Sequence, residues 1–156
     1  MKLYHTDLRL GAELQAAGRR SVVELADAIG LSQTPCARRI RQLEQAGVIQ
    51  GYSAIVDPAK LGLKVEAFVQ VKLERHLDEN VEKFRKALEA LDAVVSCYAT
   101  TGEYDFMLHV VAPDLEALST LVLRRLVKLP FVRDVHSSIA LERVKRSVRV
   151  PLDHLA

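Results

Sequence analysis

Arginine and glutamine side chains gather on one short stretch of this chain, LSQTPCARRIRQLEQAGVIQGY, which begins at Leu31. Taken as a helix that advances about 100° per residue, this stretch has one apolar seam. The seam consists of Cys36, Ile40 and Leu43. Arg38 and Arg41 then fall on the opposite side of the helix. Because Arg and Gln carry bidentate groups that match guanine and adenine edges, this face has the chemistry to read bases in a DNA major groove.

Other polar groups of this region extend the candidate surface to phosphates. A recognition helix uses its N-terminal half for bases, and here that half begins with Ser32, Gln33 and Thr34. Arginines farther along the helix or in the preceding loop can bind phosphates, as can free backbone N–H groups at helix N-termini. A solvated charged face is the alternative, but Glu44 is the only acid between residues 28 and 56. The candidate DNA-contacting residues are Ser32, Gln33, Thr34, Arg38, Arg39, Arg41, Arg19 and Arg20.

Three short helices are expected to position that face. The first covers residues 7–16, and its core side is expected to consist of Leu8, Ala12 and Leu14. A serine caps each of the next two helices, and Ser21 with Glu24 has the spacing of a capping box. Gly30 ends the second helix and Gly47 the third. A tight glycine-containing turn between the second and third helices is typical of a helix-turn-helix, with a generic three-helix core as the alternative.

The second half of the chain alternates between strand and helix patterns. VEAFVQVKLE, from Val65, has the period of two that a half-buried strand shows. A helical stripe, two strand-like runs, a helix opened by Pro113 and a last strand in FVRDVHSSIALERV follow. The two helical stripes comprise Val81, Phe84, Leu88 and Leu91, then Leu115, Leu118, Val122, Leu126 and Leu129. The order βαββαβ predicts a ferredoxin-like unit with both helices on one face of an antiparallel sheet, and Phe68 on the other face indicates a partner subunit.

Length and composition agree with an α+β protein of two small domains. The 156 residues divide into a helix-turn-helix domain over 1–57, a linker over 58–63 and a ferredoxin-like domain over 64–156. The net charge is only +2, so DNA binding has to rest on a local patch. No apolar run reaches the length of a membrane span. We therefore expect a soluble cytoplasmic protein.

Cysteines and histidines show no spacing that would hold a metal. Cys36 and Cys97 fit neither a disulfide framework nor a zinc site, and both are expected to be buried thiols, with the pair Cys97–Tyr98 in the strand core. The five histidines are scattered, although His109 and His136 could lie on neighbouring strands. We expect no metal, no cofactor and no catalytic residue.

The sequence resembles the Lrp/AsnC family of transcriptional regulators, also called feast/famine regulators. The resemblance is carried by GRRSVVELADAIGLSQTPCARRIRQLEQAGVIQGYSAIVDPAKLG, by CYATTGEYDFMLHVVAPD and by SSIAL followed by VK, in this order and at family spacing. It implies a winged or wing-like helix-turn-helix joined to a βαββαβ effector and oligomerisation domain. It also implies dimers formed through the sheets, tetramers or octamers built from them, binding of double-stranded DNA and response to a small effector, usually an amino acid.

The resemblance further points to a loop that contacts the effector. The family pattern Gly-x-Tyr-Asp is matched by Gly102, Tyr104 and Asp105, while Ser137 and Ser138 align with small hydroxyl residues on the last strand. Gly102 would let the backbone approach a ligand, and Asp105 can accept hydrogen bonds from an α-ammonium group. A hairpin turn stabilised by its own Asp is the alternative.

Two other functions are alternatives to a sequence-specific regulator, and the C-terminal tail has two alternative roles. An architectural nucleoid-type protein would bind DNA with little sequence preference. An enzyme similar to haem-precursor decarboxylases would need histidines in the effector cleft. The basic tail RVKRSVRVPLDHL could contact DNA a second time, but we expect it to form a further strand that crosses to the partner chain and covers a sheet edge.

Overall fold

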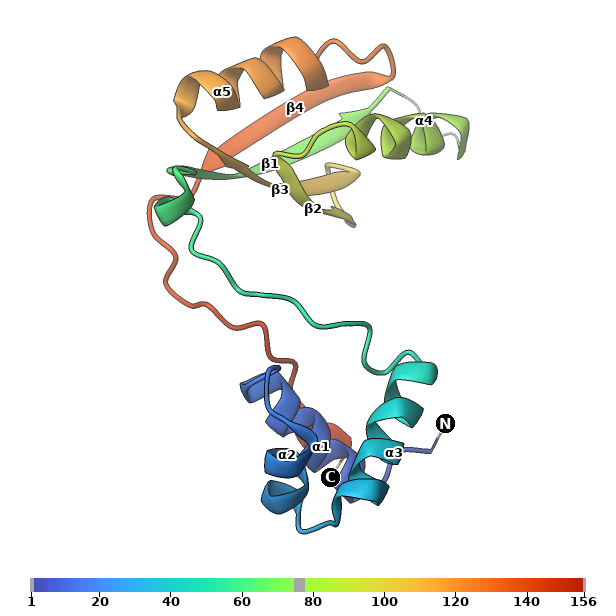
Figure 1. The fold of residues 1–156 in the computed structure, drawn as a ribbon. Helices are drawn as coiled ribbons and strands as arrows, with labels where there is room; N and C mark the ends of the chain where they lie inside the picture. Colours follow the sequence, from blue (N-terminus) through green and yellow to red (C-terminus); the bar gives the residue numbers. More distant parts are fainter. Residues whose placement is uncertain (1, 75–77, 156) are drawn as a thin grey trace. The chain divides into compact units, whose positions relative to one another are not determined.

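The computed structural model describes residues 2–74 and 78–155, which form two compact units (Figure 1). The first unit comprises the residues up to Ile55 together with those from Lys145, and the second comprises Val56–Val144. The tail therefore groups with the first unit, whereas the sequence-based division placed it in the second. The physical reason is that Val150 bonds Gln15 of α1 and Leu152 lies beside Gly11 of the same helix.

Three helices build the first unit: α1 (His5–Ala16), α2 (Val22–Ile29) and α3 (Gln33–Gln45). The predicted caps of α2 are confirmed, because the Ser21 hydroxyl accepts the Glu24 N–H while the Glu24 carboxylate accepts the Ser21 N–H. Gly30 ends α2 in the left-handed region with φ of 74°. That conformation, which suits glycine, allows the tight turn into α3.

The core of this unit differs from prediction on the first helix. Leu10 is fully buried, whereas Ala12 is exposed. Leu10 packs with Leu25 of α2 and Leu43 of α3 in one cluster. The predicted seam of α3 is confirmed, since Cys36 and Leu43 are buried and Ile40 packs against the same cluster. Leu14 packs against this cluster as predicted, and the prediction was wrong at Ala12. The helices that α1 meets decide which side of a weakly amphipathic helix turns inward.

The second unit is a four-stranded antiparallel sheet in the order β2-β3-β1-β4. Its strands are β1 (Val65–Leu73), β2 (Val94–Ala99), β3 (Phe106–Ala112) and β4 (Val132–Ile139). Helix α4 (Asp78–Glu89) and helix α5 (Leu115–Ser119), which continues as a π-helical segment over Thr120–Leu126, supply apolar side chains to one face of the sheet. This arrangement is the ferredoxin-like fold that the order of elements predicted.

Two details of this unit correct the sequence analysis. Leu115, the first residue of α5, is 58% exposed, whereas Leu118 and Leu126 are buried as predicted. Leu121, which the predicted stripe omitted, is also buried, because the π-helical segment changes the helical period. Cys97 is exposed and Tyr98 is 64% exposed, so this pair is not strand core. Both lie on β2, which is an edge strand of the sheet and has only one neighbour.

The sheet face opposite the helices carries a cluster of polar and aromatic side chains. Phe68 is 42% exposed and its ring stacks on His109, with 5.2 Å between ring centroids. Oε1 of Glu66 lies 2.5 Å from Nε2 of His109 and 2.5 Å from Nη2 of Arg143. A large exposed aromatic on this face is the feature from which the sequence analysis expected a partner subunit.

This cluster predicts a dependence of stability on pH. Burial raises the pKa of Glu66, but hydrogen bonds from Arg143 and His109 outweigh burial, so its pKa lies below the ordinary value of 4.5. Because the pKa of Glu66 is lower in the folded chain than in the unfolded chain, the ionised carboxylate stabilises the fold above pH 4.5. This stability is lost as the pH falls through the folded-state pKa. We expect Glu66→Gln to lower the free energy of unfolding near pH 7 and to match the parent chain below that pKa, as measured by urea unfolding. The exposed Glu116→Gln serves as control, and a loss that does not change with pH would contradict the assignment.

Candidate nucleic-acid interface and ligand loop

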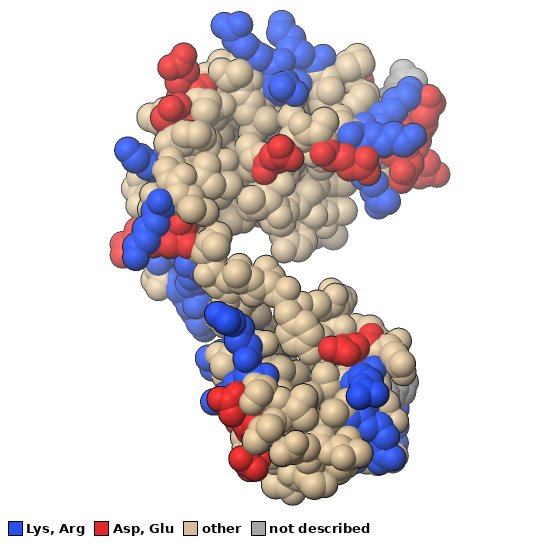
Figure 2. All heavy atoms as spheres, in the orientation of Figure 1, with Lys and Arg blue, Asp and Glu red and all other residues tan. Residues whose placement is uncertain are grey.

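The outer face of α3 is exposed and basic. Thr34, Arg38 and Arg41 are exposed on the side of the helix away from buried Cys36, and Gln33 is exposed at its N-terminal end. A shallow hollow on this face is lined by Val22, Gln33, Thr34, Ala37, Arg38 and Arg41. Figure 2 shows basic side chains on the α3 side of this unit, with few acidic ones beside them. Within residues 2–74 and 78–155, neither the Arg38 nor the Arg41 side chain has a hydrogen bond or ion pair, so both guanidinium groups are available to an anionic partner.

The N-terminus of α3 also offers polar groups. Ser32 occupies the N-cap position, but its side chain makes no capping hydrogen bond and is exposed. The first turn of any helix leaves backbone N–H groups without intrahelical partners. These groups and the helix dipole favour a phosphate at this end, next to Gln33 and Thr34.

Arg39 has a different environment from its neighbours. Its Nη1 donates to Oδ1 of Asp7 at 2.8 Å, and its guanidinium carbon lies 5.9 Å from the centroid of the Tyr4 ring. The Asp7 side chain is only 4% exposed, and its Oδ2 accepts the Tyr4 N–H at 2.9 Å. Arg39 therefore joins α3 to the start of α1, which is a structural role in addition to the DNA contact predicted for it. Sequence analysis missed this ion pair. The signal that could have found it is Asp7, a carboxylate on the side of α1 that turns toward the core.

We expect Arg39→Ala to lower the free energy of unfolding by about 1–3 kcal/mol, because it leaves the buried Asp7 carboxylate without its cationic donor. Chemical unfolding followed by circular dichroism measures this loss. Arg38→Ala removes the same charge from the adjacent position, where no carboxylate is paired, and should change stability by less than about 0.5 kcal/mol. Equal losses in the two variants would show that the Asp7 contact does not matter.

The two loop arginines are exposed but differ in their partners. Arg19 and Arg20 lie between α1 and α2, directly before the Ser21 cap. Arg20 pairs with Glu13, whereas no pair is found for Arg19 within the described part of the chain. Arg19 therefore has the more available guanidinium group for a phosphate near the N-terminus of α2.

The predicted ligand loop joins β2 to β3. Gly102 has φ of 116°, a conformation that side chains with a Cβ rarely adopt. Asp105 Oδ2 accepts the Leu73 N–H at 2.8 Å, and the Asp105 N–H donates to the Val71 carbonyl at 3.0 Å. Asp105 thus fixes the end of β1 to the loop, a structural contact that differs from the turn-stabilising role considered as the alternative. A carboxylate held in this way can still accept further hydrogen bonds.

Tyr104 connects this loop to β4 through Asp134, a residue that the sequence analysis missed. Its hydroxyl donates to Oδ2 of Asp134 at 3.0 Å, and its ring centroid lies 6.3 Å from that of His136. The hydrogen bond to Asp134 raises the pKa of Tyr104, with burial and nearby acids adding to the effect. Because residues i and i+2 of a strand share a face, the period of β4 was the signal that could have placed Asp134 and His136 together.

Ser137 and Ser138 do not meet at one point. Ser137 pairs in register with Val69, which faces the helices, whereas Ser138 pairs with Phe68 on the open face. Consecutive side chains of a strand point to opposite faces. At most one of these serines can therefore contribute to any single site on one face of the sheet.

The described residues contain no metal site of the usual kind. Among them there is no group of three or more His, Cys, Asp or Glu side chains that could hold an ion. His109 and His136 lie on β3 and β4, which are separated by β1. Within the described ranges, no helix is long and apolar enough to cross a membrane.

The fold and these surfaces define a DNA-binding regulator with a separate ligand-binding domain. Sequence models of a winged helix-turn-helix DNA-binding domain and of the Lrp/AsnC ligand binding domain match residues 5–50 and 66–150, respectively. The chain belongs to the Lrp/AsnC family of transcriptional regulators.

Relatives and solved structures agree with this assignment. The leucine-responsive regulatory proteins of Escherichia coli K12 and Klebsiella pneumoniae are each 38% identical over 138 residues, which cover 88% of this chain and 84% of theirs. A transcriptional regulator from Neisseria meningitidis, solved in complex with L-Met, has a TM-score of 0.95 at 36% identity and covers 99% of this chain and 100% of its own. An AsnC family regulator from Agrobacterium tumefaciens has a TM-score of 0.91 at 34% identity, with the same coverage of 99% and 100%.

Proposed function

We propose that this protein is a sequence-specific regulator that reads its operator with the outer face of α3 and responds to an amino acid through the loop at Gly102–Asp105. The observation that carries the DNA-binding part is the exposure of Arg38 and Arg41 opposite the buried Cys36–Leu43 seam. Helix α3 would enter the major groove, with Gln33 and Thr34 near base edges and Arg19 on the phosphates.

The amino-acid part of the proposal rests on the ligand loop and on the names of related proteins. One relative is called a leucine-responsive regulatory protein, and one similar structure is an L-Met complex. The Asp105 carboxylate offers acceptors for an α-ammonium group, and the loop backbone at Gly102, whose φ is 116°, offers N–H groups for a carboxylate. The open sheet face that carries Phe68 would meet a second copy, so the functional protein would be a homodimer or a larger assembly of dimers.

A competition assay tests the DNA-binding part. Genomic fragments retained by the protein supply a candidate operator, and labelled operator is then competed with unlabelled operator or random duplex at one fixed salt concentration. A sequence-specific regulator should bind its operator about 10³-fold or more tightly than random DNA. Equal competition by both duplexes would reject the proposal in favour of an architectural, nucleoid-type protein.

A thermal-shift screen of the twenty amino acids tests the effector part. A ligand that binds only the folded chain stabilises it and so raises its melting temperature. At a ligand concentration one hundred times Kd, the stabilisation is about 2.7 kcal/mol. One amino acid or a small chemical group of them should raise the melting temperature and change operator affinity. A flat response to all twenty would reject an amino-acid effector.

A further inference from the structure

The C-terminal tail begins with contacts to the sheet. After β4 the Ala140 N–H donates to the Glu66 carbonyl at 2.9 Å, and Arg143 contacts the Glu66 carboxylate. Leu141 and Val144 are 98% and 91% exposed. Residues 140–152, all of which the structure describes, form no strand within the single chain.

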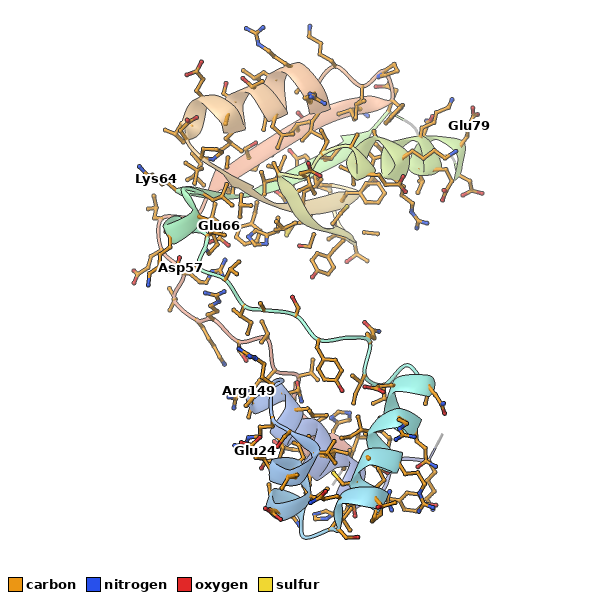
Figure 3. All side chains as sticks on the ribbon, in the orientation of Figure 1. Glu24, Asp57, Lys64, Glu66, Glu79 and Arg149 are labelled. Atoms are coloured by element: carbon orange, nitrogen blue, oxygen red, sulfur yellow. The ribbon has the colours of Figure 1, made fainter. Side chains whose placement is uncertain are left out.

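The tail ends against α1 of the first unit. The Gln15 side chain bonds both backbone groups of Val150: its Oε1 accepts the Val150 N–H at 2.6 Å, and its Nε2 donates to the Val150 carbonyl at 3.3 Å. This amide acts as a strand neighbour would, because it satisfies one donor and one acceptor of the same residue. Figure 3 labels Arg149, the residue before this clamp, beside the helices of the unit.

The next part of the tail lines an apolar groove together with α1 and the segment that follows α3. The groove has a volume of about 290 Å³, and its lining includes Leu8, Leu14, Leu43, Val48, Ile49 and Leu152. Leu152 is partly buried, whereas Val148 and Val150 are each 63% exposed and Leu155 is 48% exposed. Among the large apolar residues from Leu141 to Leu155, only Leu152, which lines the groove, is partly buried.

This groove is next to the recognition helix. Leu43 belongs to α3, and Val48 and Ile49 follow directly after that helix. Tyr52 also lines the groove, and its hydroxyl donates to Glu44 of α3 at 2.9 Å. A side chain seated here therefore contacts both α1 and the segment that ends α3.

We infer that this groove is a docking surface for the chain's own C-terminal tail, so that Val150, held by Gln15, and Leu152 complete the DNA-binding unit from the far end of the sequence. The occupant is residues 149–153 of the same chain, held by a backbone clamp at Val150 and an apolar anchor at Leu152. The unit is thus connected to the ligand-binding domain at two places along the chain, near residues 55 and 145, instead of one.

Hydrogen exchange in the full-length protein tests this inference. Leu152→Asp should accelerate amide exchange in α1 and in residues 48–52 by about tenfold or more, because a charged side chain cannot occupy the apolar groove. Val148→Asp puts the same charge on an exposed neighbour in the same tail and should leave exchange within about twofold of the parent chain. Equal exchange in the two variants would overturn the inference.

A second variant blocks the groove without changing the tail. A Cβ placed on Gly11 would lie 3.8 Å from Cδ1 of Leu152, so Gly11→Leu directs its larger side chain at the docked leucine. Leucine is also a better helix former than glycine, so α1 itself should not be weakened. Faster exchange of amides in residues 149–153 is expected, and unchanged protection there would count against docking. Because neither readout uses DNA or an amino acid, this test can fail independently of the proposed function.

Thiol cross-linking identifies which chain supplies the tail. Gly11→Cys with Leu152→Cys, in a chain whose exposed Cys97 is replaced by serine, is treated with a short bismaleimide reagent and analysed on a denaturing gel. A cross-linked monomer supports docking within one chain. A covalent dimer would assign the groove to the tail of a second copy, and a lack of cross-linking would reject docking altogether.

Discussion

Arg38→Ala is expected to weaken operator binding about 10- to 100-fold and to leave stability and oligomeric state unchanged. One bidentate arginine–base pair contributes about 1–3 kcal/mol of discrimination, and Arg38 lies exposed at the middle of the outer face of α3. Arg41→Ala, one helical turn farther on, should have an effect of similar direction. Fluorescence anisotropy with labelled operator and with random duplex measures both affinities.

The comparison of the two duplexes distinguishes base contact from phosphate contact. If Arg38 reads a base, the variant loses operator affinity and retains random-DNA affinity, whereas a phosphate contact weakens both and reduces the salt slope by about one. Arg124→Ala removes an exposed arginine from the second unit and is the matched control, for which we expect little change. Unchanged operator affinity in both Arg38→Ala and Arg41→Ala would show that the outer face of α3 is not the reading surface.

Asp105→Asn is expected to lower amino-acid affinity about 10- to 100-fold while DNA binding persists. The asparagine carbonyl can still accept the Leu73 N–H that Asp105 accepts at 2.8 Å, so the loop should keep its connection to β1. The charge that would pair with an α-ammonium group is lost, and a hydrogen bond to a charged group contributes about 1.5–3 kcal/mol. Calorimetric titration with the amino acid found in the thermal screen gives the two affinities.

Glu103→Gln is the matched control for this prediction. It removes one negative charge from an exposed neighbour in the same loop and should leave amino-acid affinity within about twofold. Normal effector uptake by Asp105→Asn would remove Asp105 from the site and leave it with the structural contact to β1 alone. A loss of affinity in both variants would indicate a general effect of loop charge instead of a specific contact.

The sequence by itself determined the features of this protein that depend on residues close together in the chain. The capping box at Ser21 and Glu24, the left-handed end of α2 at Gly30 and the buried seam of α3 each follow from spacings of three or four residues. The order of helical and strand periods was enough to predict the βαββαβ sheet. Opposite orientations of Ser137 and Ser138 also follow from strand alternation, although they were predicted as one group.

Tertiary structure alone decided which of these local features meet. The pair of Arg39 and Asp7 joins residues 32 apart, and the clamp of Gln15 on Val150 joins residues 135 apart. Cys97 is exposed because β2 is an edge strand, a position set by the strand order and not by the local pattern. The physical reason is that periodicity specifies which side of an element is apolar, whereas the partner of a charged or polar side chain depends on which surfaces pack together.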